Sequence, residues 1–258
     1  MKQYVCIDIG GTEIKYGVLD ENELFLTKDK MPTEAFKGGP SLLEKAVGIV
    51  REYLKLWRVD GICVSTAGMV DVEKGEIFYS APLIPDYAGT KIKARMESEF
   101  GLPCEVENDV NCAGLSEAVS GAAAGSRSAL CLTVGTGIGG CIIIDGNVYH
   151  GFSNSACEVG YMHMEGSDFQ TLGAASILAS KVALAKGEPV HMWNGLRIFE
   201  LAKAGALGSS NSSGTGPSST GNAGNGTVGN SSTGTNNTAT NNTGTNSTGN
   251  SGPGTAAG

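Results

Sequence analysis

The chain carries one short pattern twice: an apolar strand, a loop rich in glycine, and a second apolar strand that ends in an acidic turn. The first copy occupies residues 5–22 and the second occupies residues 130–147. The loop glycines are Gly10 and Gly11 in the first copy, and Gly135, Gly137, Gly139 and Gly140 in the second. Two such hairpins in one chain predict a duplicated, two-lobed architecture.

Segments typical of strands and helices alternate along the first 207 residues. Apolar runs predict strands at 4–9, 14–19, 61–65, 103–106, 130–134 and 141–144, and a further strand near 23–27. Helical spacing predicts helices at 40–57, with Ser41 as its cap, and at 91–100, 109–124, 168–186 and 191–204. This alternation predicts an α/β fold.

Residues 208–258 differ in composition from the rest of the chain. They contain no charged, aromatic, Leu, Ile, Met or Cys residue, so all 18 basic and 26 acidic side chains lie in residues 1–207. A segment with so little apolar surface cannot offset the entropy that it would lose on ordering. We therefore expect an N-terminal lobe over 1–118, a partial C-terminal lobe over 119–207, and a low-complexity, disordered tail over 208–258.

Charge and hydropathy exclude several classes of partner. The net charge is −8 and the Lys and Arg residues are scattered, which argues against binding to a nucleic-acid backbone. No run approaches the roughly 18 apolar residues of a membrane helix, and the first residues form a strand pattern instead of a secretion signal. The seven cysteines are widely spaced and include no C-x-x-C pair, so most are expected to act as small hydrophobic residues. These features predict a cytoplasmic protein without a membrane partner.

The two glycine loops are candidate phosphate-binding sites. A loop without side chains lets backbone N–H groups approach a phosphate closely and form an anion-binding concavity. Asp8 lies at the end of the strand before the first loop, and its side chain is expected to point to where a Mg²⁺ ion that bridges phosphates would lie. Thr12 offers a hydroxyl for a further contact. The alternative is that both loops are ordinary hairpin turns.

The second loop also matches the G-x-G-x-x-G fingerprint of dinucleotide-binding proteins through Gly135, Gly137 and Gly140. That fingerprint has to open a helix. Here the following residues are β-branched and lead into a turn, so the context argues against a nicotinamide site.

Asn108 and Asp109 lie at a predicted strand-to-helix junction, where α/β proteins bind ligands. Asp109 is a candidate general base, because phosphoryl transfer needs a carboxylate that orients a hydroxyl and accepts its proton. The alternative is that Asp109 only caps the helix.

Three further features are candidates for contacts with a polar substrate. The segment 65–71 follows a buried strand and offers hydroxyl and backbone groups, and the alternative is an ordinary loop. Glu158 could accept hydrogen bonds from sugar hydroxyls. His150 and His163 are expected to be hydrogen-bonded structural residues and not ligands.

Three motifs together resemble those of the ROK family of bacterial sugar kinases and related repressors, which have the actin-like ATPase (ribonuclease H-like) fold. The segment 8–15, DIGGTEIK, resembles the first phosphate motif of that family. The segment 107–114, ENDVNCAG, resembles its catalytic motif, and 135–140, GTGIGG, resembles its second phosphate motif. The resemblance runs from the start of the chain to about residue 205.

The resemblance implies ATP-dependent phosphorylation of a hexose hydroxyl, with ATP and Mg²⁺ as cofactors. By carry-over, Asp109 is the general base, and the sugar is bound by Gly68, Asn108, Glu158 and Gln170. The implied phosphate-binding residues are Asp8, Gly10, Gly11, Thr12, Lys15, Gly135, Thr136, Gly137 and Gly139, with Asp8 holding Mg²⁺ through water. A homodimer is a further expectation, since family members are often dimers.

The chain departs from the family pattern in two places. Many members bind zinc through a His and three Cys residues, but this chain has Tyr161 at the His position and residues 165–170, EGSDFQ, in place of the thiolates, so no zinc is expected. Family members also continue with further helices, a core strand and an adenosine-binding loop, so we expect the second lobe to be incomplete here. The first phosphate strand begins at once, which argues against a helix-turn-helix repressor.

Three functions therefore stay open at this point. The leading hypothesis is a sugar kinase of the ROK type. The second is a catalytically inactive sugar- or nucleotide-binding remnant of such a kinase, and the third is an actin-like ATPase that does not act on sugars. Asn108, Asp109 and Glu158 favour a sugar, because they supply partners for hydroxyl groups that a bare ATPase would not need.

Overall fold

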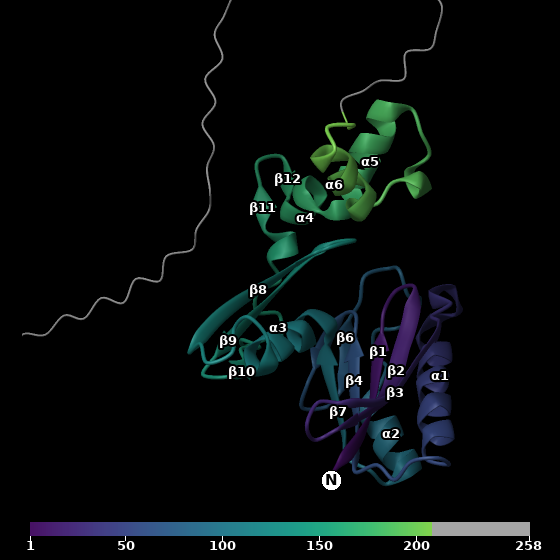
Figure 1. The fold of residues 1–258 in the computed structure, drawn as a ribbon. Coiled ribbons are helices and arrows are strands. Elements are labelled where there is room, and N and C mark those ends of the chain that lie inside the picture. The colour runs from purple at the N-terminus through teal and green to yellow at the C-terminus, as the bar shows by residue number, and fades with distance from the viewer. Residues whose placement is uncertain (208–258) are drawn as a thin grey trace, which may run out of the picture. The chain divides into compact units, whose positions relative to one another are not determined.

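The computed structural model describes residues 1–207, which form an α/β structure with two main sheets (Figure 1). The tail expected at 208–258 lies outside the described residues. The first sheet has five strands in the order β3-β2-β1-β4-β7. These strands are β1 (Gln3–Ile9), β2 (Glu13–Asp20), β3 (Phe25–Pro32), β4 (Gly61–Thr66) and β7 (Cys104–Asn108). Strands β1, β2 and β3 are antiparallel neighbours, whereas β4 runs parallel to β1 and β7 runs parallel to β4.

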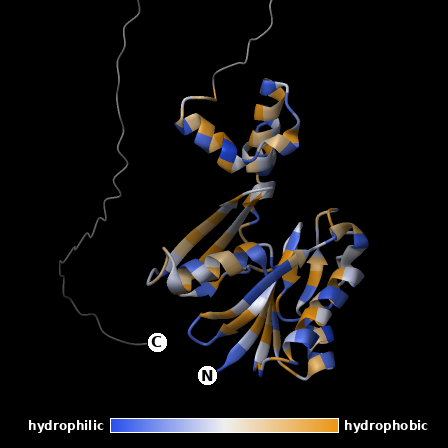
Figure 2. Ribbon diagram, turned by 45° about the vertical axis from the view of Figure 1, so that its right-hand side comes forward, coloured by the Kyte–Doolittle hydropathy of each residue, from blue (hydrophilic) through white to orange (hydrophobic). Residues whose placement is uncertain are grey.

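The alternation of residues along β1 divides the first sheet into two faces. Val5, Ile7 and Ile9 are buried in the main core, whereas Cys6 and Asp8 lie on the opposite face. The core is completed by apolar side chains of α1 (Gly38–Tyr53) and α2 (Ile92–Phe100). Figure 2 shows hydrophobic residues interspersed with hydrophilic ones on the strands of this sheet.

The second sheet is antiparallel and has the order β10-β9-β8. Its strands are β8 (Ser128–Val134), β9 (Ile138–Ile144) and β10 (Asn147–Val148). Helix α3 (Asp109–Ser120) follows β7 directly and packs against β8 and β9 through the buried Gly114. The same helix also contacts β4 and β7, so it joins the two sheets.

The remaining elements are short. Strands β5 (Met69–Asp71) and β6 (Glu76–Tyr79) form one hairpin, and β11 (His163–Met164) and β12 (Ser167–Asp168) form another. Helices α4 (Phe169–Gly173), α5 (Ala175–Lys186) and α6 (Gly195–Lys203) follow, and three 3₁₀ turns lie at Ala35–Lys37, Val159–Tyr161 and Val190–Met192. A small core between α5 and α6 contains Ala183, Trp193 and Ile198.

The structure confirms the α/β class and both glycine-looped hairpins, β1–β2 and β8–β9. The third strand is longer than predicted and extends to Pro32, because an exposed strand at the edge of the sheet can carry polar residues such as Lys28 and Lys30. The β5–β6 hairpin was not predicted from the sequence. The boundary at residue 118 falls inside α3, and the division into lobes stays a prediction.

Two predicted helices differ in detail from the structure. Ser41 does not cap α1, because the helix begins earlier, at Gly38, and has no side-chain cap. The single helix predicted for 168–186 is instead two helices, since Ala174 adopts an extended conformation between them. Asp168 caps the first of these helices by accepting from the backbone N–H of Thr171 at 2.8 Å.

One face of the second sheet exposes apolar side chains along β8, at Leu130, Leu132 and Val134. Residues at alternate positions of a strand share a face, so these three side chains form a stripe.

Among residues 1–207, no helix is both long and apolar enough to cross a membrane.

Replacing Gly114 by alanine tests the packing of α3 on the second sheet. A Cβ atom at this position would lie 2.6 Å from Cys141 Sγ and 2.9 Å from Cys141 Cβ. We expect Gly114→Ala to lower the free energy of unfolding by about 1–3 kcal/mol, the usual cost of overpacking a core. Thermal and urea denaturation would measure the change.

The matched control is Gly48→Ala in α1, another glycine inside a helix. No atom lies within 4 Å of a Cβ built at Gly48, so only helix propensity changes. That substitution should stabilise the protein by about 0.5–1 kcal/mol. Equal stability of the two variants would contradict the close approach of α3 to β9.

Candidate functional site

The site is built around the junction where β7 ends and α3 begins. Asn108 is the N-cap of α3, and its Oδ1 accepts from the backbone N–H groups of Val110 at 2.9 Å and Asn111 at 3.1 Å. The alternative that Asp109 caps the helix is therefore wrong, because Asp109 is the first residue inside it. The cap leaves the Asp109 side chain available for another role.

The other end of the Asn108 amide connects two predicted site residues. Its Nδ2 donates to the carbonyl oxygen of Gly68 at 2.9 Å and to Asp109 Oδ1 at 3.0 Å. Gly68 has a φ of 98°, and a Cβ there would lie 2.9 Å from the Tyr79 carbonyl oxygen, so glycine is required at this position. The junction thus holds the turn after β4 against the start of α3.

Asp109 lies in an environment that favours its protonated form. Burial, and then the negative charge of Asp8, raise the pKa of Asp109, although the backbone N–H of Val110 opposes this shift. Asp109 Oδ1 accepts from Asn108 and Val110, whereas no hydrogen bond reaches Oδ2 within residues 1–207. A carboxylate with a raised pKa and a free oxygen can accept a proton from a bound hydroxyl.

A cavity of about 440 Å³ adjoins this junction and collects most of the predicted sugar-binding residues. The predicted residues that line it are Gly68, Asn108, Asp109, Gly135, Thr136, Gly137, Gly139, Glu158 and Gln170. Residues from both sheets therefore meet in one cavity, although they are widely separated in the sequence.

Glu158 presents a second carboxylate to this cavity. Burial, and then the charge of Asp109, raise its pKa. Its carboxylate oxygens have no protein hydrogen-bond partner in the described part of the chain, so they are available to accept from the hydroxyl groups of a ligand. Tyr161 also lines the cavity, and its phenol interacts with Gln170 and Tyr79.

The second glycine loop is held against this cavity by close packing. A Cβ at Gly139 would lie 2.6 Å from Val110 Cγ2, and a Cβ at Gly137 would lie 2.9 Å from Gln170 Oε1. The loop is also tied to α5, because Ser176 Oγ donates to the carbonyl oxygen of Thr136 at 2.6 Å. Gly139 is therefore needed for packing whether or not a phosphate binds, whereas the close neighbour of Gly137 is the flexible end of the Gln170 side chain.

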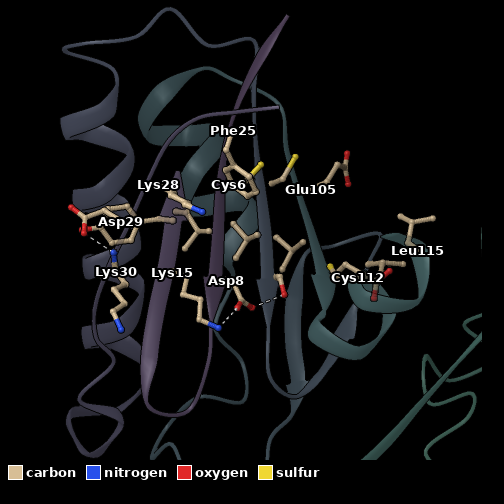
Figure 3. A pocket seen from close by; sticks show the side chains of 18 residues that line it. Cys6, Asp8, Lys15, Phe25, Lys28, Asp29, Lys30, Glu105, Cys112 and Leu115 are labelled. Carbon is tan, nitrogen blue, oxygen red and sulfur yellow. Dashed lines mark hydrogen bonds and ion pairs between the residues drawn. The ribbon is translucent and has the colours of Figure 1, made fainter. Parts of the chain in front are cut away.

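Asp8 and Lys15 line a different cavity, of about 940 Å³, on the open face of the first sheet (Figure 3). Ser65 Oγ donates to Asp8 Oδ1 at 2.9 Å, and Lys15 Nζ lies 4.0 Å from Asp8 Oδ2. The negative charge of Asp8 contributes to the raised pKa of Asp109, which lines the 440 Å³ cavity.

The first glycine loop lines neither cavity. The backbone N–H of Gly10 donates to the Glu13 carbonyl oxygen at 3.1 Å, and the backbone N–H of Thr33 donates to the Thr12 carbonyl oxygen at 2.9 Å. Nothing lies within 4 Å of a Cβ built at Gly11, so that side of the loop is open. The role of Gly10, Gly11 and Thr12 in phosphate binding stays a prediction.

Asp8 has the features that an indirect Mg²⁺ site requires. Mg²⁺ keeps several water ligands and is held by one or two carboxylates together with the phosphates of a substrate. The Asp8 side chain is 43% exposed, which leaves Oδ2 accessible to hydrated ions. Within residues 1–207, no group of three or more His, Cys, Asp or Glu residues is arranged to hold a metal ion by itself.

Sequence reasoning missed the part played by Glu107. Its Oε1 accepts from the Asn108 backbone N–H at 2.8 Å and from Asn111 Nδ2 at 3.0 Å, and its Oε2 lies 2.6 Å from His150 Nε2. The Glu107 carboxylate therefore links the junction to the segment that leads to Glu158. A carboxylate next to Asn108 and a histidine shortly before Glu158 were visible in the sequence, but only the fold brings them together.

The charge of Asp109 should cost stability at neutral pH. We expect Asp109→Asn to raise the Tm at pH 7 by about 2–4 °C, the change that ~1 kcal/mol produces in a domain of this size. Because the folded-state pKa of Asp109 lies above its unfolded value, this gain should disappear below about pH 4, where the carboxyl is protonated in both states. Thermal melts over a range of pH would measure it.

Asp20→Asn is the control, and we expect it to change the Tm in the opposite direction. Hydrogen bonds from the backbone N–H of Leu24 and of Asn22 lower the pKa of Asp20, so its charge stabilises the fold above its unfolded pKa. The Tm of that variant at pH 7 should fall. A fall in both variants would contradict the environment described for Asp109.

Comparisons with known proteins identify the family and the fold of the chain. The sequence profile of the ROK family matches residues 4–180. An uncharacterised protein of Clostridium perfringens is 53% identical over 207 residues, which are 80% of this chain and 70% of that protein. The glucokinase of Streptomyces coelicolor is 35% identical over 164 residues, and the match covers 62% of this chain and 49% of the glucokinase. The chain thus spans about half the length of that relative.

A similar solved structure is that of a ROK family glucokinase from Streptomyces griseus in complex with glucose and AMPPNP. It is 27% identical, with a TM-score of 0.68, and the match covers 79% of this chain and 72% of that one. The α/β structure with its mixed sheet is therefore that of the ROK proteins, which have the actin-like ATPase fold. Since the family profile covers more than half of the sequence and the fold agrees, the chain belongs to the ROK family.

Proposed function

We propose that this protein catalyses the ATP-dependent phosphorylation of a hydroxyl group on a hexose or hexose derivative. The observation that carries the proposal is the 440 Å³ cavity that Asp109 and Glu158 both line, and in which Asp109 Oδ2 accepts no hydrogen bond from residues 1–207. The relatives named above include a glucokinase and a complex with glucose and AMPPNP, which supports a hexose and ATP as substrates.

In the proposed reaction, Asp109 acts as the general base. The hexose hydroxyl oxygen attacks the γ-phosphorus of ATP, its proton passes to Asp109 Oδ2, and ADP leaves with the electron pair of the broken P–O bond. Asn108 acts mainly by positioning Asp109, because its Nδ2 donates to Asp109 Oδ1 and to the Gly68 carbonyl oxygen. These two hydrogen bonds fix the carboxylate relative to the turn at Gly68.

The remaining hydroxyl groups of the sugar are assigned to Glu158 and Gln170. A carboxylate accepts hydrogen bonds only, whereas an amide both donates and accepts, so the pair can distinguish hydroxyl positions. Burial of Glu158 strengthens each hydrogen bond that its carboxylate accepts.

The phosphates of ATP are assigned to the two glycine loops, with Lys15 contributing positive charge. Backbone N–H groups at Gly11 and Gly137 can approach phosphate oxygens without steric conflict from side chains. The N–H groups of Gly10 and Gly135 donate within the loops, to the carbonyl oxygens of Glu13 and Gly137, and so hold the loop conformation. A Mg²⁺ ion held through water by Asp8 would neutralise charge that develops on the phosphates. The two lobes, the homodimer and the cytoplasmic location predicted from the sequence stay predictions.

The test is a coupled assay of ADP release with Mg·ATP and a panel of hexoses that includes glucose, a β-glucoside and N-acetylmannosamine. We expect ADP release that depends on one of these sugars, and a loss of at least about a hundredfold in kcat for Asp109→Asn, since a positioned base contributes 10²–10⁴. Sugar affinity measured by calorimetry should change little, because asparagine keeps the hydrogen bonds that hold Oδ1.

Asp145→Asn is the matched control, since Asp145 is an exposed carboxylate in the turn after β9 and pairs with Arg127. Its φ of 48° also suits asparagine, so the variant should retain the activity of the unmodified protein. Unchanged turnover in Asp109→Asn would rule out the assigned base. Saturable sugar binding with no ADP release would instead identify a catalytically inactive binding protein, and ADP release indifferent to any sugar would identify an ATPase.

A further inference from the structure

A pair of cysteines lies side by side on the open face of the first sheet. Cys6 of β1 and Cys63 of β4 are direct partners in the parallel register. Both line the 940 Å³ cavity that also contains Asp8 and Ser65, and Figure 3 shows Cys6 directed into it. The catalytic proposal uses neither thiol.

The two thiols belong to paired residues of adjacent strands and differ in accessibility. Cys63 is exposed, whereas Cys6 is half-buried. The Cys6 Sγ–H group lies within reach of two acceptors, the Tyr4 carbonyl oxygen at 3.9 Å and the Cys63 sulfur. The hydrogen bond that Cys6 donates to Cys63 lowers the pKa of Cys63, although burial and the charge of Glu105 oppose this shift. The same hydrogen bond raises the pKa of Cys6.

This asymmetry divides the roles of the two sulfurs. A thiolate, not a thiol, attacks a disulfide, so the more accessible and more easily ionised Cys63 is the attacking group. Cys6 keeps its proton longer and lies next to the sulfur that would carry the mixed disulfide. Its position suits the second, resolving step.

We propose that Cys6 and Cys63 form a reversible dithiol–disulfide site that reacts with small-molecule disulfides and binds trivalent arsenicals. Cys63 sulfur attacks a sulfur of the external disulfide, and one small thiol leaves. Cys6 then attacks Cys63 sulfur, its proton goes to solvent, and the second small thiol leaves. Two protein thiols and one external disulfide thus become one protein disulfide and two free thiols, which balances atoms and electrons.

The geometry of the strands determines how easily this bond is reduced. Neighbouring strands lie about 4.8 Å apart, which is within the 4.4–6.8 Å range of Cα separations in disulfides. Paired side chains on one face of parallel strands stand side by side, so their Cβ atoms begin farther apart than the usual ~3.8 Å. Closing the bond therefore requires the two side chains to move closer together, and a disulfide that forms under such strain is more easily reduced.

A second pair of cysteines in the chain provides an internal contrast. Cys131 of β8 and Cys141 of β9 are also direct register partners. However, Cys141 is fully buried, and both side chains lie beneath α3, where a Cβ at Gly114 would be 2.6 Å from Cys141 Sγ and 3.4 Å from Cys131 Cβ. Burial first, and then the neighbouring Cys131, raise the pKa of Cys141 to about 11. Reaction should be confined to Cys6 and Cys63.

The test treats the reduced full chain with oxidised glutathione and maps the products by tryptic mass spectrometry. Cys6 lies in the tryptic peptide 3–15 and Cys63 in the peptide 59–74, and neither peptide contains another cysteine. We expect the two peptides to become linked with the loss of two hydrogens, and to separate again on addition of dithiothreitol. A mixed disulfide at Cys63 that never resolves onto Cys6 would overturn the proposal.

Phenylarsine oxide, which binds paired thiols, gives a readout that needs no oxidation. The unmodified protein should take up one equivalent, and both Cys63→Ser and Cys6→Ser should lose that uptake. The matched control Cys131→Ser should keep it. Uptake that survives in Cys63→Ser, with circular dichroism confirming that each variant is folded, would show that this pair is not the binding site.

Discussion

Four hydrogen bonds of the Asn108 side chain hold the junction between β7 and α3, and the arrangement of the candidate site depends on them. Two are accepted from the first turn of α3 and two are donated, to Gly68 and to Asp109. Since α3 packs on both sheets, the same cap that begins this helix also sets the position of Asp109 relative to the second sheet. Glu107 also stabilises the junction, because its carboxylate contacts the side chains of Asn111 and His150.

The electrostatic cost of the site follows from this placement. Asp109 and Glu158 are two half-buried carboxylates that line one cavity, and burial raises the pKa of both. Their charges are not neutralised by a nearby cation of the cavity lining, because Lys15 lies with Asp8 in the neighbouring cavity. The protein thus holds carboxylates where they are costly to stability, which is the arrangement expected where they act on a ligand and not where they support the fold.

The sequence was sufficient for the fold class, the two hairpins and most of the residues that share the 440 Å³ cavity, because these depend on local patterns and on motifs. It was not sufficient for the β5–β6 hairpin, whose strands are short, or for the division of the segment 168–186 into two helices. It also left open whether Asp109 caps α3, since Asn and Asp are almost equally good N-caps and only the backbone conformation of Asn108 decides between them. The Glu107–His150 contact joins residues 43 positions apart, which no local pattern encodes.

The two glycine loops have similar sequences but satisfy different constraints. In the first loop a Cβ at Gly11 would meet nothing, so glycine there leaves open space that a phosphate could occupy. In the second loop Gly137 and Gly139 let the backbone approach Gln170 and Val110, which belong to the sugar side of the cavity and to α3. A change in the second loop would therefore reach the proposed sugar-binding residues as well as any bound phosphate. If the protein is the sugar kinase proposed above, this packing gives a physical reason why binding of nucleotide and binding of sugar would be coupled, since both would depend on the position of one loop.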